Sequence, residues 1–85
     1  MKVLIPSALR SYTEGAHAEA SGATLAAVVA DLDRQYPGIR FRMIDEQNRI
    51  RRHIRFFVNG AQVHELAQPV SADEELIIVQ ALSGG

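Results

Sequence analysis

The stretch LIIVQAL, residues 76–82, is an apolar run interrupted by a single polar residue, Gln80. A continuous apolar run of this length is typical of a central β-strand that is buried on both faces. The opening stretch MKVLIP, residues 1–6, predicts another strand, which Pro6 interrupts. If both strands lie at the centre of one sheet, they pair in parallel, and the crossover between them contains a helix.

That helix is expected within TLAAVVADLDRQYPG, residues 24–38. Thr24 is a suitable N-cap, because its hydroxyl can accept a hydrogen bond from the first helical turn. Apolar side chains then repeat at helical spacing, and Pro37 and Gly38 end the pattern. The repeating residues are Leu25, Val28, Val29, Leu32 and Tyr36.

Two hairpins complete the predicted sheet. Residues 53–58 alternate in character, and Asn59-Gly60 is a strong signal for a tight turn into a partner strand. Residues 16–21 alternate more weakly and are expected to return alongside the first strand. The remaining expectations are a turn or loop over residues 7–15, a short helical turn over 39–44, the hairpin strand over 61–66 and a connection over 67–75.

These elements define the expected fold class. One helix can cover only one face of a mixed sheet, so the pattern predicts an α+β roll of two layers. We therefore predict a β-grasp, with a mixed sheet of four to five strands and one main helix on one face. The domain should span residues 1–81, followed by a flexible tail over residues 82–85.

Composition limits the classes of function. The chain has 85 residues, 47% hydrophobic and 22% charged, which is typical of one small soluble domain. It has no cysteine, which excludes disulfides and zinc–thiolate sites and suits a reducing cytoplasm. A net charge of −1 argues against a general nucleic-acid binder. No apolar run approaches the ~20 residues of a membrane span, so we expect a cytoplasmic protein with no membrane partner.

A search for catalytic or metal-binding residues finds none. His17, His53 and His64 fall on different predicted strands, without the spacing of a metal site. The hydroxyl residues lack a nucleophile context, and no glycine-rich phosphate loop is present. So small a domain also has little room for a catalytic cavity. We therefore predict a chain that is not an enzyme, with no catalytic residue of its own and no metal.

A basic stretch precedes and enters the strand at 53–58. It could be a solvated loop and strand edge, where charge discourages aggregation. It could equally be a docking patch that attracts an acidic partner. Nucleic acid is a weaker alternative, because few aromatic residues are interleaved with the charges. The residues are Arg40, Arg42, Arg49, Arg51, Arg52 and Arg55.

The other sheet face offers a candidate docking surface. If Phe56 faces the helix, Phe57 faces away, because side chains alternate along a strand. By the same parity Ile77 and Val79 point outward beside Phe57, on a face that no helix covers. An uncovered apolar patch usually marks a partner surface, although a loop could instead fold over it. We assign Phe57, Val79, Ile77 and Arg55 to partner docking.

The last residues, Leu82, Ser83, Gly84 and Gly85, suggest a working terminus. Four residues can reach roughly 13 Å at about 3.3 Å each. Glycine has no Cβ, so Gly84 and Gly85 could enter a slot too narrow for other residues. The group delivered there would be a carboxylate, which must be activated before sulfur or nitrogen can attack it. ATP does this by forming an acyl-adenylate.

Four segments together resemble the ThiS/MoaD family of ubiquitin-like sulfur carriers. They are IPSALRSYTEG (6–15 with the preceding Ile5), TLAAVVADLDRQYPGI (24–39), RFFVNG (55–60) and ELIIVQALSGG (75–85). The pattern IPxxLRxYTxG and the arginine-containing insert before FVNG look most like the CysO-type branch, which serves cysteine synthesis. The resemblance covers essentially the whole chain.

The resemblance implies a mechanism. A ubiquitin-activating-like adenylyltransferase would use ATP to adenylate the carboxylate of Gly85. A sulfur donor would then displace AMP and leave a thiocarboxylate, from which a sulfur-accepting synthase takes the sulfur. Gly84, Ser83 and Leu82 would form the approach, and no cofactor would be bound stably. Two alternatives use the same terminus: the small subunit of molybdopterin synthase, and a ubiquitin-like modifier conjugated through Gly85.

Overall fold

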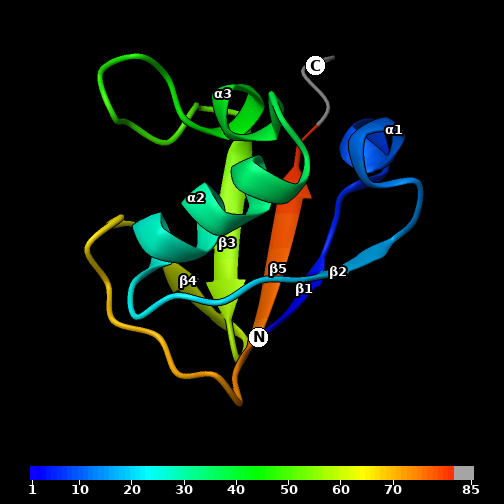
Figure 1. The fold of residues 1–85 in the computed structure, drawn as a ribbon. Coiled ribbons are helices and arrows are strands. Elements are labelled where there is room, and N and C mark those ends of the chain that lie inside the picture. Colours follow the sequence, from blue (N-terminus) through cyan, green and yellow to red (C-terminus); the bar gives the residue numbers. More distant parts are fainter. Residues whose placement is uncertain (82–85) are drawn as a thin grey trace.

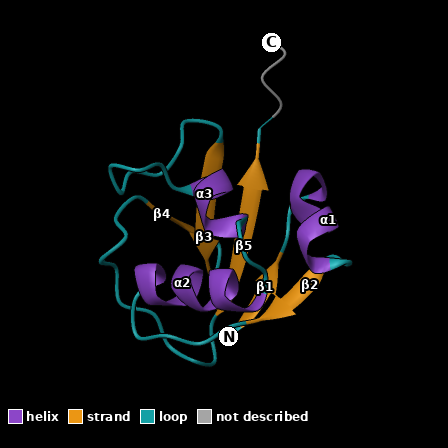
Figure 2. Cartoon of the chain, turned by 45° about the horizontal axis from the view of Figure 1, so that its top comes forward, coloured by secondary structure: helices purple, strands orange, loops and turns teal. Residues whose placement is uncertain are grey.

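A mixed β-sheet forms one layer of the molecule, and helices cover one of its faces (Figures 1 and 2). The structure is a computed structural model that describes residues 1–81. Within these residues five strands form one sheet in the order β2-β1-β5-β3-β4. The strands are β1 (Lys2–Leu4), β2 (His17–Glu19), β3 (Ile54–Val58), β4 (Ala61–Val63) and β5 (Glu75–Gln80); the helices are η1 (Ser7–Leu9), α1 (Arg10–Thr13), α2 (Leu25–Gln35) and α3 (Ile39–Met43).

The central position of β5 confirms the main expectation about the fold. It pairs in parallel with β1, with Val3 opposite Leu76, and antiparallel with β3, with Phe56 opposite Ile78. Burial on both faces was, however, a wrong prediction. Leu76 and Ile78 are buried, whereas Val79 keeps 39% of its surface exposed. The reason is that α2 and α3 lie on the same face of the sheet, so the outward residues of β5 have no helix above them.

Helix α2 forms where the apolar periodicity predicts it. Thr24 is extended, with φ −134° and ψ 165°, and its hydroxyl accepts a hydrogen bond of 3.2 Å from the Ala27 N–H. This contact satisfies one of the amide groups that a helix start leaves without a partner. At the other end Gly38 takes φ +99°, a left-handed conformation that glycine adopts without a Cβ clash, and α3 begins directly after it.

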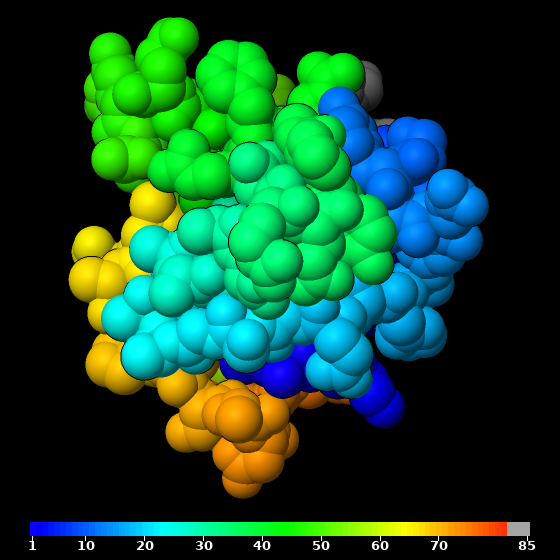
Figure 3. All heavy atoms as spheres, in the orientation of Figure 1, coloured from blue at the N-terminus to red at the C-terminus, as the bar shows by residue number. Residues whose placement is uncertain are grey.

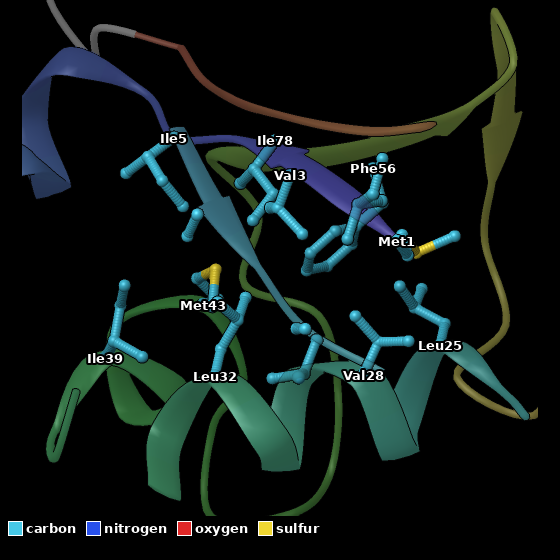
Figure 4. Close-up of a cluster of buried hydrophobic side chains, with 14 of the residues drawn as sticks. Met1, Val3, Ile5, Leu25, Val28, Leu32, Ile39, Met43, Phe56 and Ile78 are labelled. Carbon is cyan, nitrogen blue, oxygen red and sulfur yellow. The ribbon is translucent and has the colours of Figure 1, made fainter. Parts of the chain in front are cut away.

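The core lies between α2 and the sheet. In Figure 4 the buried side chains of the helix point toward those of the strands, and Ile39 and Met43 of α3 close one end of the cluster. Each fully buried large apolar side chain contributes roughly 1.5–3 kcal/mol relative to exposure. From the helical side, α2, α3 and the loops beside them hide most of the sheet (Figure 3). The facing residues include Leu25, Val28 and Leu32 on the helix and Val3, Phe56 and Ile78 on the sheet.

The segment expected as a turn or loop over residues 7–15 is instead helical. It forms η1 and α1, and the chain leaves α1 at Glu14 in a left-handed conformation with φ 58°. Two contacts hold this segment against the sheet: Leu9 is buried, and the Arg10 side chain donates a hydrogen bond of 2.8 Å to the Ile5 carbonyl. A helix of four residues is too short to show an apolar periodicity in the sequence. Its position depends instead on these tertiary contacts.

The hairpin between β3 and β4 confirms the turn that Asn59-Gly60 predicts. Both residues have positive φ, 49° and 85°, as a two-residue hairpin turn of this kind requires. Strand β4 ends at Val63, earlier than the expected hairpin strand over 61–66. Among residues 1–81, no helix has both the length and the apolar character that a membrane crossing would need.

The N-cap of α2 provides a test of this fold. Thr24→Ala removes the acceptor for the Ala27 N–H, and we expect it to lower the free energy of unfolding by about 1 kcal/mol. Thr24→Ser keeps a hydroxyl at this position, and its free energy of unfolding should stay within a few tenths of a kcal/mol of that of the parent. Urea unfolding followed by circular dichroism measures both. An alanine variant as stable as the serine variant would show that the cap contributes nothing.

Candidate functional site

The residues predicted for partner docking come together on the sheet face opposite α2. Two cross-strand pairs between β3 and β5 bring them side by side: Arg55 lies opposite Val79, and Phe57 lies opposite Ile77. Side chains of directly opposed residues have Cβ atoms about 4.5–5.5 Å apart, close enough for contact. The parity argument from the sequence is therefore confirmed in its geometry.

A fifth residue, Leu4, belongs to the same surface and was not predicted as a docking residue. It lies opposite Ile77 in the parallel β1–β5 ladder, and its neighbour Val3 is fully buried on the core side. The alternation of buried and outward residues in β1 was the signal that could have found it. We name this surface the outer sheet patch, and it consists of Leu4, Arg55, Phe57, Ile77 and Val79.

The outer sheet patch is open at one end and partly covered at the other. Val79 and Arg55 are exposed, whereas Leu4, Phe57 and Ile77 are half-buried. The alternative that a loop folds over the whole patch therefore does not hold at Val79. The Arg55 guanidinium donates hydrogen bonds to the carbonyls of Arg52, at 2.7 Å, and Ile54, at 3.0 Å. These contacts hold a positive charge beside the apolar residues.

The path of the chain out of the sheet is fixed beside this patch. The N–H of Ala81 donates a hydrogen bond of 2.8 Å to the His53 carbonyl, which ties the residue after β5 to the start of β3. The predicted tail residues Leu82, Ser83, Gly84 and Gly85 lie outside the described residues. The last described residue therefore leaves the sheet at the Arg55–Val79 end of the outer sheet patch.

Most of the predicted arginine stretch lies elsewhere, in α3 and in the loop that joins α3 to β3. Hydrogen bonds order this loop: the Asp45 carboxylate accepts from the backbone N–H groups of Arg49 and Gln47, each at 2.9 Å. The hydrogen bond from the Arg49 N–H is the main reason why the pKa of Asp45 lies below its ordinary value. Arg55 alone among the six arginines lies on the outer sheet patch.

The three histidines are not brought together. His17 lies in β2, His53 precedes β3, and His64 follows β4 at the opposite edge of the sheet. No group of three His, Cys, Asp or Glu residues within positions 1–81 is placed to hold a metal ion. Among residues 1–81 the candidate site is therefore the outer sheet patch, and these residues form no metal-binding group.

This architecture defines the class. A five-stranded mixed sheet within residues 1–81, with a parallel central pair joined through a helical crossover, is the ubiquitin-like β-grasp. The sequence model described as the ThiS family matches residues 3–85. The chain belongs to this family of ubiquitin-like sulfur carriers, which are not themselves enzymes.

Individual relatives agree with this assignment. The sulfur carrier protein CysO of Mycobacterium tuberculosis is 35% identical over 89 residues, which cover 98% of this chain and 96% of the relative. The matching chain of the Amycolatopsis orientalis BexX/CysO complex superimposes with a TM-score of 0.90 at 32% identity, over 99% of this chain and 98% of that chain. The crystal structure of M. tuberculosis CysO superimposes with a TM-score of 0.89 at 32% identity, over 95% of this chain and 98% of that chain. SAMP1 of Haloferax volcanii, at 22% identity and a TM-score of 0.81, shares the fold.

Adjacent positions in β3 provide a test of which face each residue occupies. Phe56→Ala should cost about 3–5 kcal/mol of stability, because the ring is fully buried beneath α2. Phe57→Ala should cost about 1 kcal/mol, because its ring is half-buried on the outer face. Urea unfolding of the two variants measures the difference. Equal losses would place Phe57 in the core and remove it from the outer sheet patch.

Proposed function

We propose that this chain is a sulfur carrier whose C-terminal carboxylate, on Gly85, is converted to a thiocarboxylate that donates sulfur to a biosynthetic synthase. The product would be cysteine or a related sulfur metabolite. The observation that carries the proposal is the similarity to the sulfur carrier CysO, at 35% identity over 98% of this chain. The family match also continues through residue 85 and so includes both terminal glycines.

The chemistry begins with activation of the carboxylate. A carboxylate oxygen of Gly85 attacks the α-phosphorus of ATP in a partner adenylyltransferase, which releases pyrophosphate and forms an acyl-adenylate. Sulfide, as the sulfur nucleophile, then attacks the carbonyl carbon, and the bond to AMP breaks. AMP leaves as a stabilised phosphate monoester, the hydrosulfide proton goes to solvent, and the terminus is a thiocarboxylate. The chain itself binds neither ATP nor another cofactor in this scheme.

The outer sheet patch supplies the docking surface in this scheme. Half-buried apolar side chains beside a fixed guanidinium are suited to a protein partner, because aromatic and arginine residues contribute strongly to interfaces. The patch adjoins the point where the chain leaves β5, so a partner that holds Phe57 and Val79 is also close to the terminal residues. The CysO relative of Amycolatopsis orientalis was solved in a complex with BexX. For the present chain we propose two partners: the activating adenylyltransferase and the sulfur-accepting synthase.

Absence of side chains at the terminus is a requirement of this mechanism. Gly84 would pass through the narrowest part of the partner's channel, where a Cβ leaves no clearance. Ser83 and Leu82 would span the distance from the sheet to that channel. We further propose that the carrier works in the cytoplasm, because its activation consumes ATP.

Charging of the terminus is the test of this function. The intact protein is incubated with ATP, a sulfide source and the adenylyltransferase of the same organism, and mass spectrometry follows AMP transfer and sulfur-for-oxygen exchange. Appending one alanine after Gly85, or making Gly84→Phe, should abolish both. Gly15→Ala is the matched control, because a Cβ there meets no atom within 4 Å and should leave charging unchanged.

The same measurement separates the alternatives. Normal adenylation of the extended chain, or of Gly84→Phe, would overturn the proposal that Gly85 is the activated residue. Diglycine remnants on lysines of other proteins, without any thiocarboxylate, would identify a protein modifier. Stable co-purification with a larger synthase subunit would identify the small subunit of a molybdopterin synthase-like enzyme.

A further inference from the structure

A groove of about 630 Å³ opens where β5 ends, between α1 and α3. Figure 1 shows these two helices on either side of the end of β5. Tyr12 of α1 contributes to one wall, and Phe41 and Arg42 of α3 contribute to the other. Arg51 and His53, from the loop before β3, and Gln80, the last residue of β5, also line it. The outer sheet patch does not include this groove, and the function proposed above does not use it.

Two guanidinium groups are held in position in the groove. The Arg42 Nε donates a hydrogen bond of 2.9 Å to the Tyr12 hydroxyl, which joins α3 to α1. The Arg51 Nε donates one of 2.7 Å to the Phe41 carbonyl, and its guanidinium carbon lies 4.6 Å from the centre of the Phe41 ring. Both contacts engage Nε, and within residues 1–81 the terminal amino groups of these two arginines donate no hydrogen bond. An arginine fixed in this way loses little side-chain entropy when it binds a carboxylate.

Positive charges outnumber negative ones in the segment that supplies Arg42 and Arg51. Residues 40–55 contain six arginines and two acidic residues, an excess of four positive charges in a chain whose net charge is −1. Asp45 is one of the two acids, and its carboxylate is engaged by backbone N–H groups of its own loop. Within residues 1–81 no carboxylate lies within 4.0 Å of the Arg42 or Arg51 guanidinium. Charge is therefore segregated, and the groove attracts an acidic partner.

An exposed aromatic ring accompanies these charges. Phe41 keeps 54% of its surface exposed, more than any other large apolar side chain in the described part of the protein. Its ring offers an apolar contact next to the two guanidinium groups. A ligand that binds both the guanidinium groups and the exposed ring therefore carries carboxylates and at least one apolar side chain. An acidic polypeptide segment has both, and the excess of negative charge over the rest of the chain disfavours nucleic acid.

The position of the groove indicates which protein would supply that segment. Gln80 lines the groove, whereas Val79, the residue before it, belongs to the outer sheet patch. The Ala81 N–H is hydrogen-bonded to the carbonyl of His53, which also lines the groove. The groove and the outer sheet patch therefore adjoin at the end of β5, where a partner would take up the residues after Ala81. We propose that the groove docks an acidic polypeptide segment with an apolar side chain, contributed by a partner that takes up the terminal residues.

This inference rests on the proposed function for the identity of the partner, but the binding itself is measured without that partner. The probe is a synthetic peptide, acetyl-Glu-Glu-Leu-Glu-Glu-Phe-Glu-amide, and its counterpart with every Glu replaced by Gln is the neutral control. The full chain, labelled with ¹⁵N, is titrated with each peptide while the backbone amide and arginine Nε–H signals are followed. We expect saturable shifts at Arg42, Arg51 and His53 with the acidic peptide alone, and weaker binding at higher salt.

Matched variants localise the binding. Arg42→Gln with Arg51→Gln should weaken the affinity for the acidic peptide roughly tenfold. Arg34→Gln is the control, because Arg34 is paired with Asp31 on the exposed side of α2 and should bind the peptide like the parent. Arg42→Lys with Arg51→Lys keeps the charge and should bind at an intermediate level. Urea unfolding confirms that each variant is folded.

Four outcomes would overturn the inference. The first two are no shift at the groove with the acidic peptide, and equal shifts with the neutral peptide. The third is tighter binding of a single-stranded oligonucleotide than of the acidic peptide. The fourth, measured with no peptide present, is a change of the Arg42 and Arg51 signals when the Gly85 carboxylate is converted to an amide. The last result would identify the chain's own terminus as the occupant. If Gly85 is converted normally to the thiocarboxylate but the chain does not bind the peptide, only the inference about the groove is refuted. If the chain binds the peptide but Gly85 is never converted, only the proposed function is refuted.

Discussion

The parallel pairing of β1 and β5 is the constraint on which the rest of the structure depends. Parallel neighbours cannot be joined by a tight turn, so the chain between them must cross over, and α2 lies in that crossover. The pairing aligns Val3 with Leu76 and thereby directs both residues to the core face. Because α2 and α3 cover this same face, the alternate residues of β5 remain on the outer face. The apolar surface at Phe57 and Val79 is a consequence of this one-sided cover.

The same pairing determines where the chain leaves the fold. β5 runs through the centre of the sheet and ends between α1 and α3, where the N–H of Ala81 is bound to the His53 carbonyl. Two surfaces of different character meet at this point: the outer sheet patch is mainly apolar, and the groove carries positive charge. An apolar surface contributes binding free energy by burial, while the charged groove favours one orientation of approach. Together they would direct a partner to the end of β5.

Local packing explains the features of the fold that sequence reasoning did not predict. Gly22 has no distinctive sequence context, yet a Cβ there would lie 2.6 Å from the Ala27 Cβ, so the loop before α2 passes too close to the helix for any side chain. Residues 7–13 are helical because Leu9 is buried and Arg10 binds the Ile5 carbonyl, contacts that join the segment to the sheet. The groove likewise depends on α1 and α3 lying on either side of β5, and Tyr12 and Arg42 are thirty positions apart in the chain.

The sequence by itself determined the order of the strands and of α2 along the chain, the position of α2, the Asn59-Gly60 turn and the face on which Phe57, Ile77 and Val79 lie. These follow from periodicity and turn chemistry, which depend on neighbours within a few residues. Only the tertiary structure decided that residues 7–13 are helical, that Leu4 lies opposite Ile77, and that Arg42 and Arg51 line one groove with Phe41. Those features depend on pairing register and on which face the helices cover, and both are fixed by contacts between residues far apart in the chain.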